Sequence, residues 1–249
     1  MSSKEGFRQV KRRTGAMRII HWVNVISMMT AVITGLYIAA PYYQTFMADP
    51  AVDKYVMAWN RWAHFMVAII FDVTSIIIFY LTVFSRVDRP WTKVIPNKKN
   101  LGEFAAVFIN LITLNRTKNF SSEENDSFNI VLFFTFHFLM VWMLLTGLQM
   151  YVHGLGSGLS SIGNWWPWML HFVTDWTIPV SGWMIGGGPT ASIMDVRISH
   201  HTTMWLILTW VVFHIYYQVW RTVFWKEGDI SIMFGGSKYV KIDEEEGKA

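Results

Sequence analysis

Histidine is the residue of this chain with the widest capacity for chemistry. Six of its eight histidines lie in or at the edges of long apolar stretches: His21, His64, His137, His200, His201 and His214. An ionisable side chain inside a membrane is costly and needs a partner, and neutral imidazole is a common metal ligand. The chain has no cysteine, so thiolate ligands and protein-bound iron–sulfur clusters are excluded. A single buried histidine more often serves an interhelical hydrogen bond, so spacing has to decide between the two roles.

The last apolar stretch places two histidines on one helical face. His200 and His214 are 14 residues apart, and 14 steps of about 100° return to within about 40° of the starting direction. Their heights along a helix differ by about 21 Å. His201 is 13 residues from His214 and points away from this stripe. One helix is therefore expected to present one imidazole near each membrane surface.

These histidines must be positioned by membrane helices. Of the 249 residues 53% are hydrophobic and 15% charged, against about 25% charged in soluble domains. Four stretches are long enough to cross roughly 30 Å of hydrocarbon, near residues 17–40, 61–85, 128–152 and 198–222. Residues 101–114 are too short to span and suit an interfacial helix. Residues 164–184, broken by prolines and Asp175, are expected to form an interfacial cap, with a fifth span as the alternative.

The distribution of positive charge predicts the orientation of the four spans. The basic residues are concentrated before the first span, between the second and third, and after the fourth; 18 of the 21 lie there, and only Lys54, Arg61 and Arg197 lie elsewhere. The positive-inside rule then puts both termini and the central loop in the cytoplasm. A fifth span would place the basic C-terminal segment outside, so four spans are favoured.

This topology pairs the histidines at two depths. His64 and His200 fall near the outer surface, and His21 and His214 near the inner surface. Two neutral imidazoles from facing helices are how a helical bundle holds b-type haem, and the sequence lacks the Cys-x-x-Cys-His motif of covalently attached haem. We therefore expect an all-α membrane protein: a four-helix bundle holding two haems b, formed by residues 1–249 as one domain without internal repeat.

Four further residues have open roles. Gly35 lies 14 residues after His21 and could leave room for the edge of the outer macrocycle or simply pack helices. His137 has no partner at its level, and a hydrogen-bonding role is favoured for it. Asp72 is an intramembrane carboxylate, for which a proton path and a hydrogen bond to a neighbour are equally reasonable. His201 has no assigned role.

The chain resembles the b-type cytochrome subunit of membrane-bound nickel–iron hydrogenases, which is related to the gamma subunit of formate dehydrogenase. The matching residues are Arg18-Ile-Ile-His21-Trp22, Arg61-Trp-Ala-His64-Phe65, His200-His-Thr-Thr-Met-Trp205 with His214, and the tail Gly228–Tyr239. The resemblance implies that His21, His64, His200 and His214 are the haem ligands. It also suggests Asn125 as a quinone contact, although the residues that flank Asn125 depart from the family pattern.

The resemblance also implies partners and a location. These are a hydrogenase small subunit with iron–sulfur clusters, through it the large subunit, and menaquinone or ubiquinone in a bacterial inner membrane, without nucleic acid. The chain would pass electrons without activating hydrogen, because it has no cysteine to bind nickel and iron. The alternatives are a cytochrome subunit of a formate dehydrogenase or thiosulfate reductase, and a haem-free anchor or transporter. A di-iron hydroxylase would need clustered His-x-x-His-His boxes, which the sequence lacks.

Overall fold

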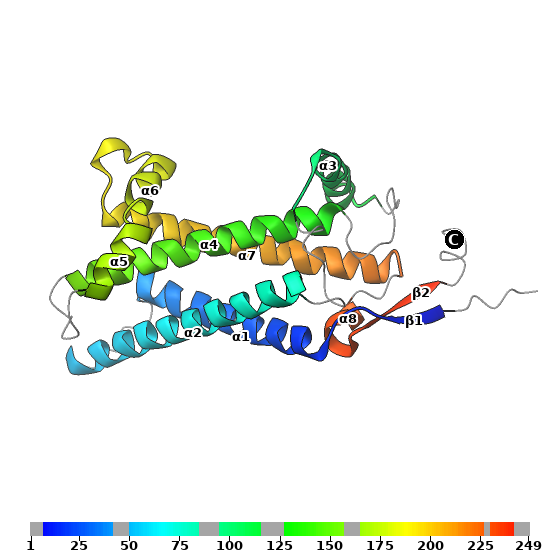
Figure 1. The fold of residues 1–249 in the computed structure, drawn as a ribbon, viewed down its shortest axis with the longest axis horizontal. Helices are drawn as coiled ribbons and strands as arrows, with labels where there is room; N and C mark the ends of the chain where they lie inside the picture. Colours follow the sequence, from blue (N-terminus) through cyan, green and yellow to red (C-terminus); the bar gives the residue numbers. More distant parts are fainter. Residues whose placement is uncertain are drawn as a thin grey trace, which may run out of the picture. The chain divides into compact units, whose positions relative to one another are not determined.

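Helices dominate the computed structural model of the chain, which describes residues 7–41, 50–84, 95–115, 127–156, 165–226 and 230–241. Figure 1 shows the elements along the chain. They are β1 (Phe7–Lys11), α1 (Gly15–Ala39), α2 (Pro50–Phe84), α3 (Lys98–Ile112), α4 (Ser127–Gly156), α5 (Trp165–Thr174), α6 (Thr177–Ile185), η2 (Gly188–Thr190), α7 (Ile193–Val223), α8 (Ile230–Gly235) and β2 (Ser237–Lys241).

Long helices occupy all four stretches that the sequence predicted to span the membrane. Within the described ranges, three segments are long and apolar enough to cross a bilayer: Gly15–Ala39, Val56–Leu81 and Ser127–Gly154. Helix α7 has 31 residues but is not among them, because histidines, threonines and a glutamine interrupt its apolar residues. The protein is thus a membrane protein with three candidate spans among its described residues, and the fourth remains a prediction.

The chain divides into two compact units, and each contains part of α1, α2, α4 and α7. Unit 1 comprises Met1–Met29, Ile69–Phe134 and Val211–Ala249, and unit 2 comprises Thr30–Ala68 and Thr135–Trp210. The sequence pattern gave no indication of this division, because it cuts through continuous apolar helices. His21 and His214 belong to unit 1, and His64 and His200 to unit 2.

In unit 1 the two ends of the chain meet in a small β-ladder, which the sequence analysis did not predict. Strand β1 pairs with β2 in antiparallel register, with Gln9 opposite Tyr239, and Figure 1 shows the two strands side by side. Helix α8 packs against the start of α1, where Trp22 Nε1 donates to the Met233 carbonyl at 3.1 Å. The ladder holds strand β2 beside the N-terminal strand, which leads into the helix that carries His21.

Helix α3 confirms the short helix expected near residues 101–114. It begins with a capping box, in which the Asn97 side chain accepts from the Asn100 backbone and the Asn100 side chain accepts from the Asn97 backbone. Its aromatic face packs within unit 1: the Phe104 and Phe128 rings are stacked, with centroids 4.9 Å apart. The Leu111 carbonyl accepts a hydrogen bond of 3.2 Å from the Tyr216 hydroxyl, which ties α3 to α7.

In unit 2, residues 165–185 form two short helices, α5 and α6, of 10 and 9 residues. A helix of that length rises only about 15 Å, so neither crosses a bilayer by itself. The buried Gln149 side chain accepts a hydrogen bond from Thr174 and donates to Asp175 Oδ1 at 3.2 Å. These bonds hold the end of α5 to α4; the interfacial position of this segment stays a prediction.

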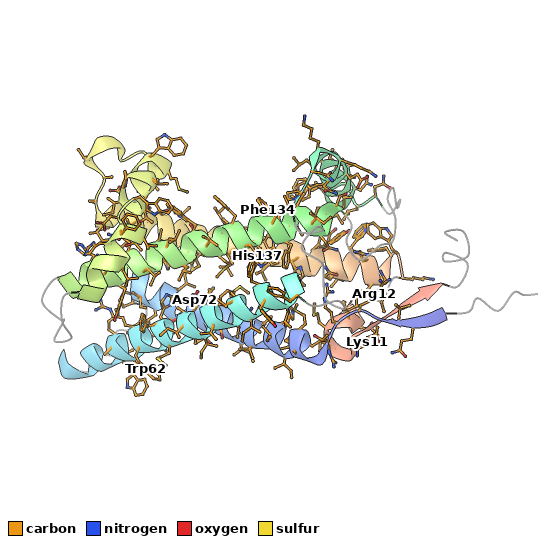
Figure 2. All side chains as sticks on the ribbon, in the orientation of Figure 1. Lys11, Arg12, Trp62, Asp72, Phe134 and His137 are labelled. Atoms are coloured by element: carbon orange, nitrogen blue, oxygen red, sulfur yellow. The ribbon has the colours of Figure 1, made fainter. Side chains whose placement is uncertain are left out.

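The long helices carry many exposed apolar side chains. Ile26 and Ile33, seven residues apart on α1, are 66% and 53% exposed, and Ile76 on α2 is 67% exposed. Figure 2 shows the Trp62 indole projecting away from the ribbon of α2. Outward apolar stripes of this extent are surfaces for lipid in a membrane protein.

Candidate functional site

Unit 2 brings the imidazole rings of His64 on α2 and His200 on α7 together in an edge-on arrangement. Their ring centroids are 6.4 Å apart and the ring planes are inclined by 66°. Metal–imidazole bonds are about 2 Å long, so two such bonds plus the half-widths of two rings place the ring centres roughly 6 Å apart. The spacing of these two imidazoles therefore fits an iron held between them.

The ring of His64 is fixed at one nitrogen by helix α1. Its Nδ1 lies 3.0 Å from the Ala31 carbonyl oxygen and 3.0 Å from Thr34 Oγ1. A carbonyl oxygen can only accept, so Nδ1 carries the proton. The other nitrogen, Nε2, is then unprotonated, as a metal-bound imidazole requires.

Helix α4 holds His200 in the same way. Its Nδ1 lies 2.9 Å from Thr146 Oγ1, and the backbone of Met143 is close enough to interact with the ring. Nearby, Trp142 Nε1 donates to Ser199 Oγ at 2.9 Å, which fixes α4 against α7 beside the ring. If Nδ1 of His200 carries the proton, its Nε2 has the lone pair that can bind a metal.

A glycine lies against each of the two rings. An added Cβ would lie 3.2 Å from His64 Cε1 at Gly35 and 3.5 Å from His200 Cε1 at Gly147. The first distance is tighter than ordinary van der Waals contact, so Gly35 gives space to the imidazole of His64 itself. Whether it also makes room for a macrocycle edge stays a prediction.

Thr34, Thr146 and Gly147 were not among the residues predicted from the sequence, although the sequence contains a local signal for them. Thr34-Gly35-Leu36 on α1 and Thr146-Gly147-Leu148 on α4 are the same tripeptide. In both cases the threonine contacts a histidine Nδ1 and the glycine faces the ring of that histidine. The same three residues thus support a histidine ring from two different helices.

Unit 1 contains the second histidine pair. His21 lies on α1 and His214 on α7, and the two imidazoles are close enough to interact. The His21 ring packs edge-on against Trp22 at 5.6 Å, and Trp22 is in turn fixed to α8. The structure thus places His64 beside His200 and puts His21 and His214 in one unit; their role as haem ligands stays a prediction.

The remaining candidate residues lie outside these pairs. The His137 ring packs edge-on against Phe136 at 5.8 Å, and His201 Nε2 accepts a hydrogen bond of 3.2 Å from Trp205 Nε1. Asp72 lies half-buried on α2, where Figure 2 labels it together with His137. Asn125, the predicted quinone contact, lies outside the residues that the structure describes.

Comparison with known proteins identifies the family of the chain. Residues 12–236 match the model of the prokaryotic cytochrome b561 family, and the chain belongs to that family; it is a b-type cytochrome, so haem b is its cofactor. The "probable Ni/Fe-hydrogenase B-type cytochrome subunit" of Rhodobacter capsulatus is 26% identical over 97% of this chain and 88% of the relative. The subunit of the same name from Cupriavidus necator is 26% identical, over 90% and 85% of the two chains. The "probable Ni/Fe-hydrogenase 1 B-type cytochrome subunit" of Escherichia coli K12 is 24% identical over 92% of this chain and 92% of the relative.

Proposed function

We propose that this chain is the membrane cytochrome subunit of a nickel–iron hydrogenase and passes electrons from that enzyme to quinone. The single observation that carries the proposal is the His64–His200 pair, 6.4 Å apart, with both Nδ1 atoms engaged by neighbouring helices. The names of the relatives support hydrogenase as the donor.

Four histidines would hold two haems b in this proposal. His64 and His200 are the ligands at one site, and His21 and His214 at the other. Haem, when bound, supplies a one-electron couple at each site. The protein contributes imidazoles whose Nε2 atoms can bind iron, and the hydrogen bonds at Nδ1 fix the ring orientations of His64 and His200.

The two sites would lie at different membrane depths. His200 and His214 are 14 residues apart on the continuous helix α7, so about 21 Å separates their positions along its axis. The positive-inside pattern places His200 toward the periplasm and His214 toward the cytoplasm. Electrons would enter on the periplasmic side from an iron–sulfur subunit and leave to quinone on the cytoplasmic side, near the segment that contains Asn125.

This direction of transfer makes hydrogen oxidation electrogenic. Two electrons that cross against the membrane potential require about 4.6 kcal/mol per 100 mV, at about 2.3 kcal/mol per charge. With protons for the quinol taken from the cytoplasm, each turnover separates charge. Hydrogen is a sufficiently strong reductant to drive it.

The test is the complex of this chain with its hydrogenase in sealed proteoliposomes that contain menaquinone, with a potential-sensitive dye as readout. Addition of hydrogen should reduce quinone and generate a membrane potential, and an ionophore that collapses the potential should abolish the dye signal without stopping quinone reduction. The hydrogenase reconstituted without this chain is the control and should reduce no quinone. Quinone reduction without a potential would contradict the electrogenic arrangement, and absence of quinone reduction would contradict the conduit itself.

A further inference from the structure

Unit 2 builds the same histidine support twice, from two separate pairs of helices. On α1 and α2, the Ala31 carbonyl and Thr34 Oγ1 both lie 3.0 Å from His64 Nδ1. On α4 and α7, Thr146 Oγ1 lies 2.9 Å from His200 Nδ1, and the backbone of Met143 is close enough to interact with the same ring. Ala31 and Met143 each precede their threonine by three residues, so one turn of helix supplies both partners.

The hydroxyl protons of the two threonines have their own acceptors. Thr34 Oγ1 donates to the Thr30 carbonyl at 2.7 Å, and Thr146 Oγ1 donates to the Trp142 carbonyl at 2.8 Å. A hydroxyl has one proton and two lone pairs. Each oxygen therefore presents a lone pair to the imidazole, and the histidine Nδ1–H is the donor.

We propose that Thr34 and Thr146 are positioning residues that set the redox potential of the haem site formed by His64 and His200. This inference rests on the proposed ligand pair and deepens it. An acceptor at Nδ1 fixes the ring orientation and makes the imidazole a stronger electron donor at Nε2. Stronger donation favours ferric over ferrous iron, so the two hydroxyls lower the potential of this site.

The test is a spectroscopic redox titration of the purified complex carrying Thr34→Val, Thr146→Val or both. Valine keeps the branched shape and removes the acceptor, so the potential of one haem should rise while the other stays constant. Loss of a residue that hydrogen-bonds to a metal ligand typically lowers metal affinity or activity tenfold to hundredfold. The Ala31 carbonyl still lies beside His64 Nδ1 in these variants. We therefore expect a change near tenfold in the ferric-to-ferrous ratio, about 59 mV for one electron, with a larger rise in the double variant.

Two further variants separate this role from a structural one. Thr34→Ser and Thr146→Ser restore the hydroxyl and should return the potential to the wild-type value. Thr203→Val is the matched control, since Thr203 is a buried threonine of α7 whose hydroxyl donates to the Ser199 carbonyl at 2.8 Å; it should leave both potentials unchanged.

The outcomes distinguish this inference from the proposed function. Full haem content with unshifted potentials in both valine variants would overturn the positioning role and leave the ligand assignment intact. Equal shifts in the valine and serine variants would overturn it too, because packing rather than the hydroxyl would then be responsible. Wild-type protein without haem at His64 and His200 would instead refute the proposed function on which the inference depends.

Discussion

Replacement of His64 by alanine is expected to remove one of two haems b from the purified complex and to abolish hydrogen-dependent quinone reduction. The variant removes one of two imidazoles whose centres lie 6.4 Å apart, and a single remaining ligand cannot hold the low-spin site. Loss of a residue that only hydrogen-bonds to a metal ligand typically lowers metal affinity or activity tenfold to hundredfold. Loss of the ligand itself should therefore lower the rate of quinone reduction at least about a hundredfold. Haem extraction with protein quantification measures the first effect, and a quinone-reduction assay the second.

His200→Ala should give the same result, because the two imidazoles serve one iron. His153→Ala is the control: His153 is an exposed histidine of α4 that belongs to neither pair, and its loss should leave haem content unchanged. Retention of full haem content and an unaltered spectrum in His64→Ala would contradict the pairing.

The second large effect is expected from His214→Ala, which should separate the electron entrance from the exit. The variant should lose the haem of unit 1 and keep that of unit 2. Under hydrogen the remaining haem should become reduced and stay reduced. Quinone reduction should fall by at least about a hundredfold, because loss of a ligand has a larger effect than loss of a residue that only hydrogen-bonds to it. Absorption spectra recorded under hydrogen, together with quinol yield, measure both.

A matched control is available one turn further along α7. Gln218 Nε2 donates to Asn129 Oδ1 at 3.3 Å, so Gln218→Ala perturbs the same helix without removing an imidazole and should keep both haems. If His214→Ala reduced quinone at the wild-type rate, the electron exit would have to lie elsewhere than at the His21–His214 pair.

The proposed histidine pairing could be inferred from the sequence, because it depends on helical spacing and charge distribution. Helical geometry places His200 and His214 on one stripe, and the positive residues orient the apolar stretches relative to one another. Long apolar runs also predicted α1, α2 and α4 closely, except that α2 begins at Pro50 rather than near residue 61. That early start adds a polar extension with Asp53 and Lys54, which a search for apolar spans does not detect.

Other features needed the three-dimensional arrangement. Thr34 and Thr146 look like ordinary helix threonines until the helices that carry His64 and His200 are placed beside them. The repeated Thr-Gly-Leu tripeptide was a usable signal, but a three-residue repeat has meaning only once its partners are known. The β1–β2 ladder was also unpredictable, because it joins the two ends of the chain through backbone hydrogen bonds.

The most direct test of the central claim is the haem content of the wild-type polypeptide, expressed with ample haem supply and purified with its hydrogenase. We expect two haems b for each copy of this chain, with the spectroscopic signature of low-spin iron held by two imidazoles. A preparation with one haem for each chain, or a colourless one, would contradict the assignment of His21, His64, His200 and His214 as two ligand pairs.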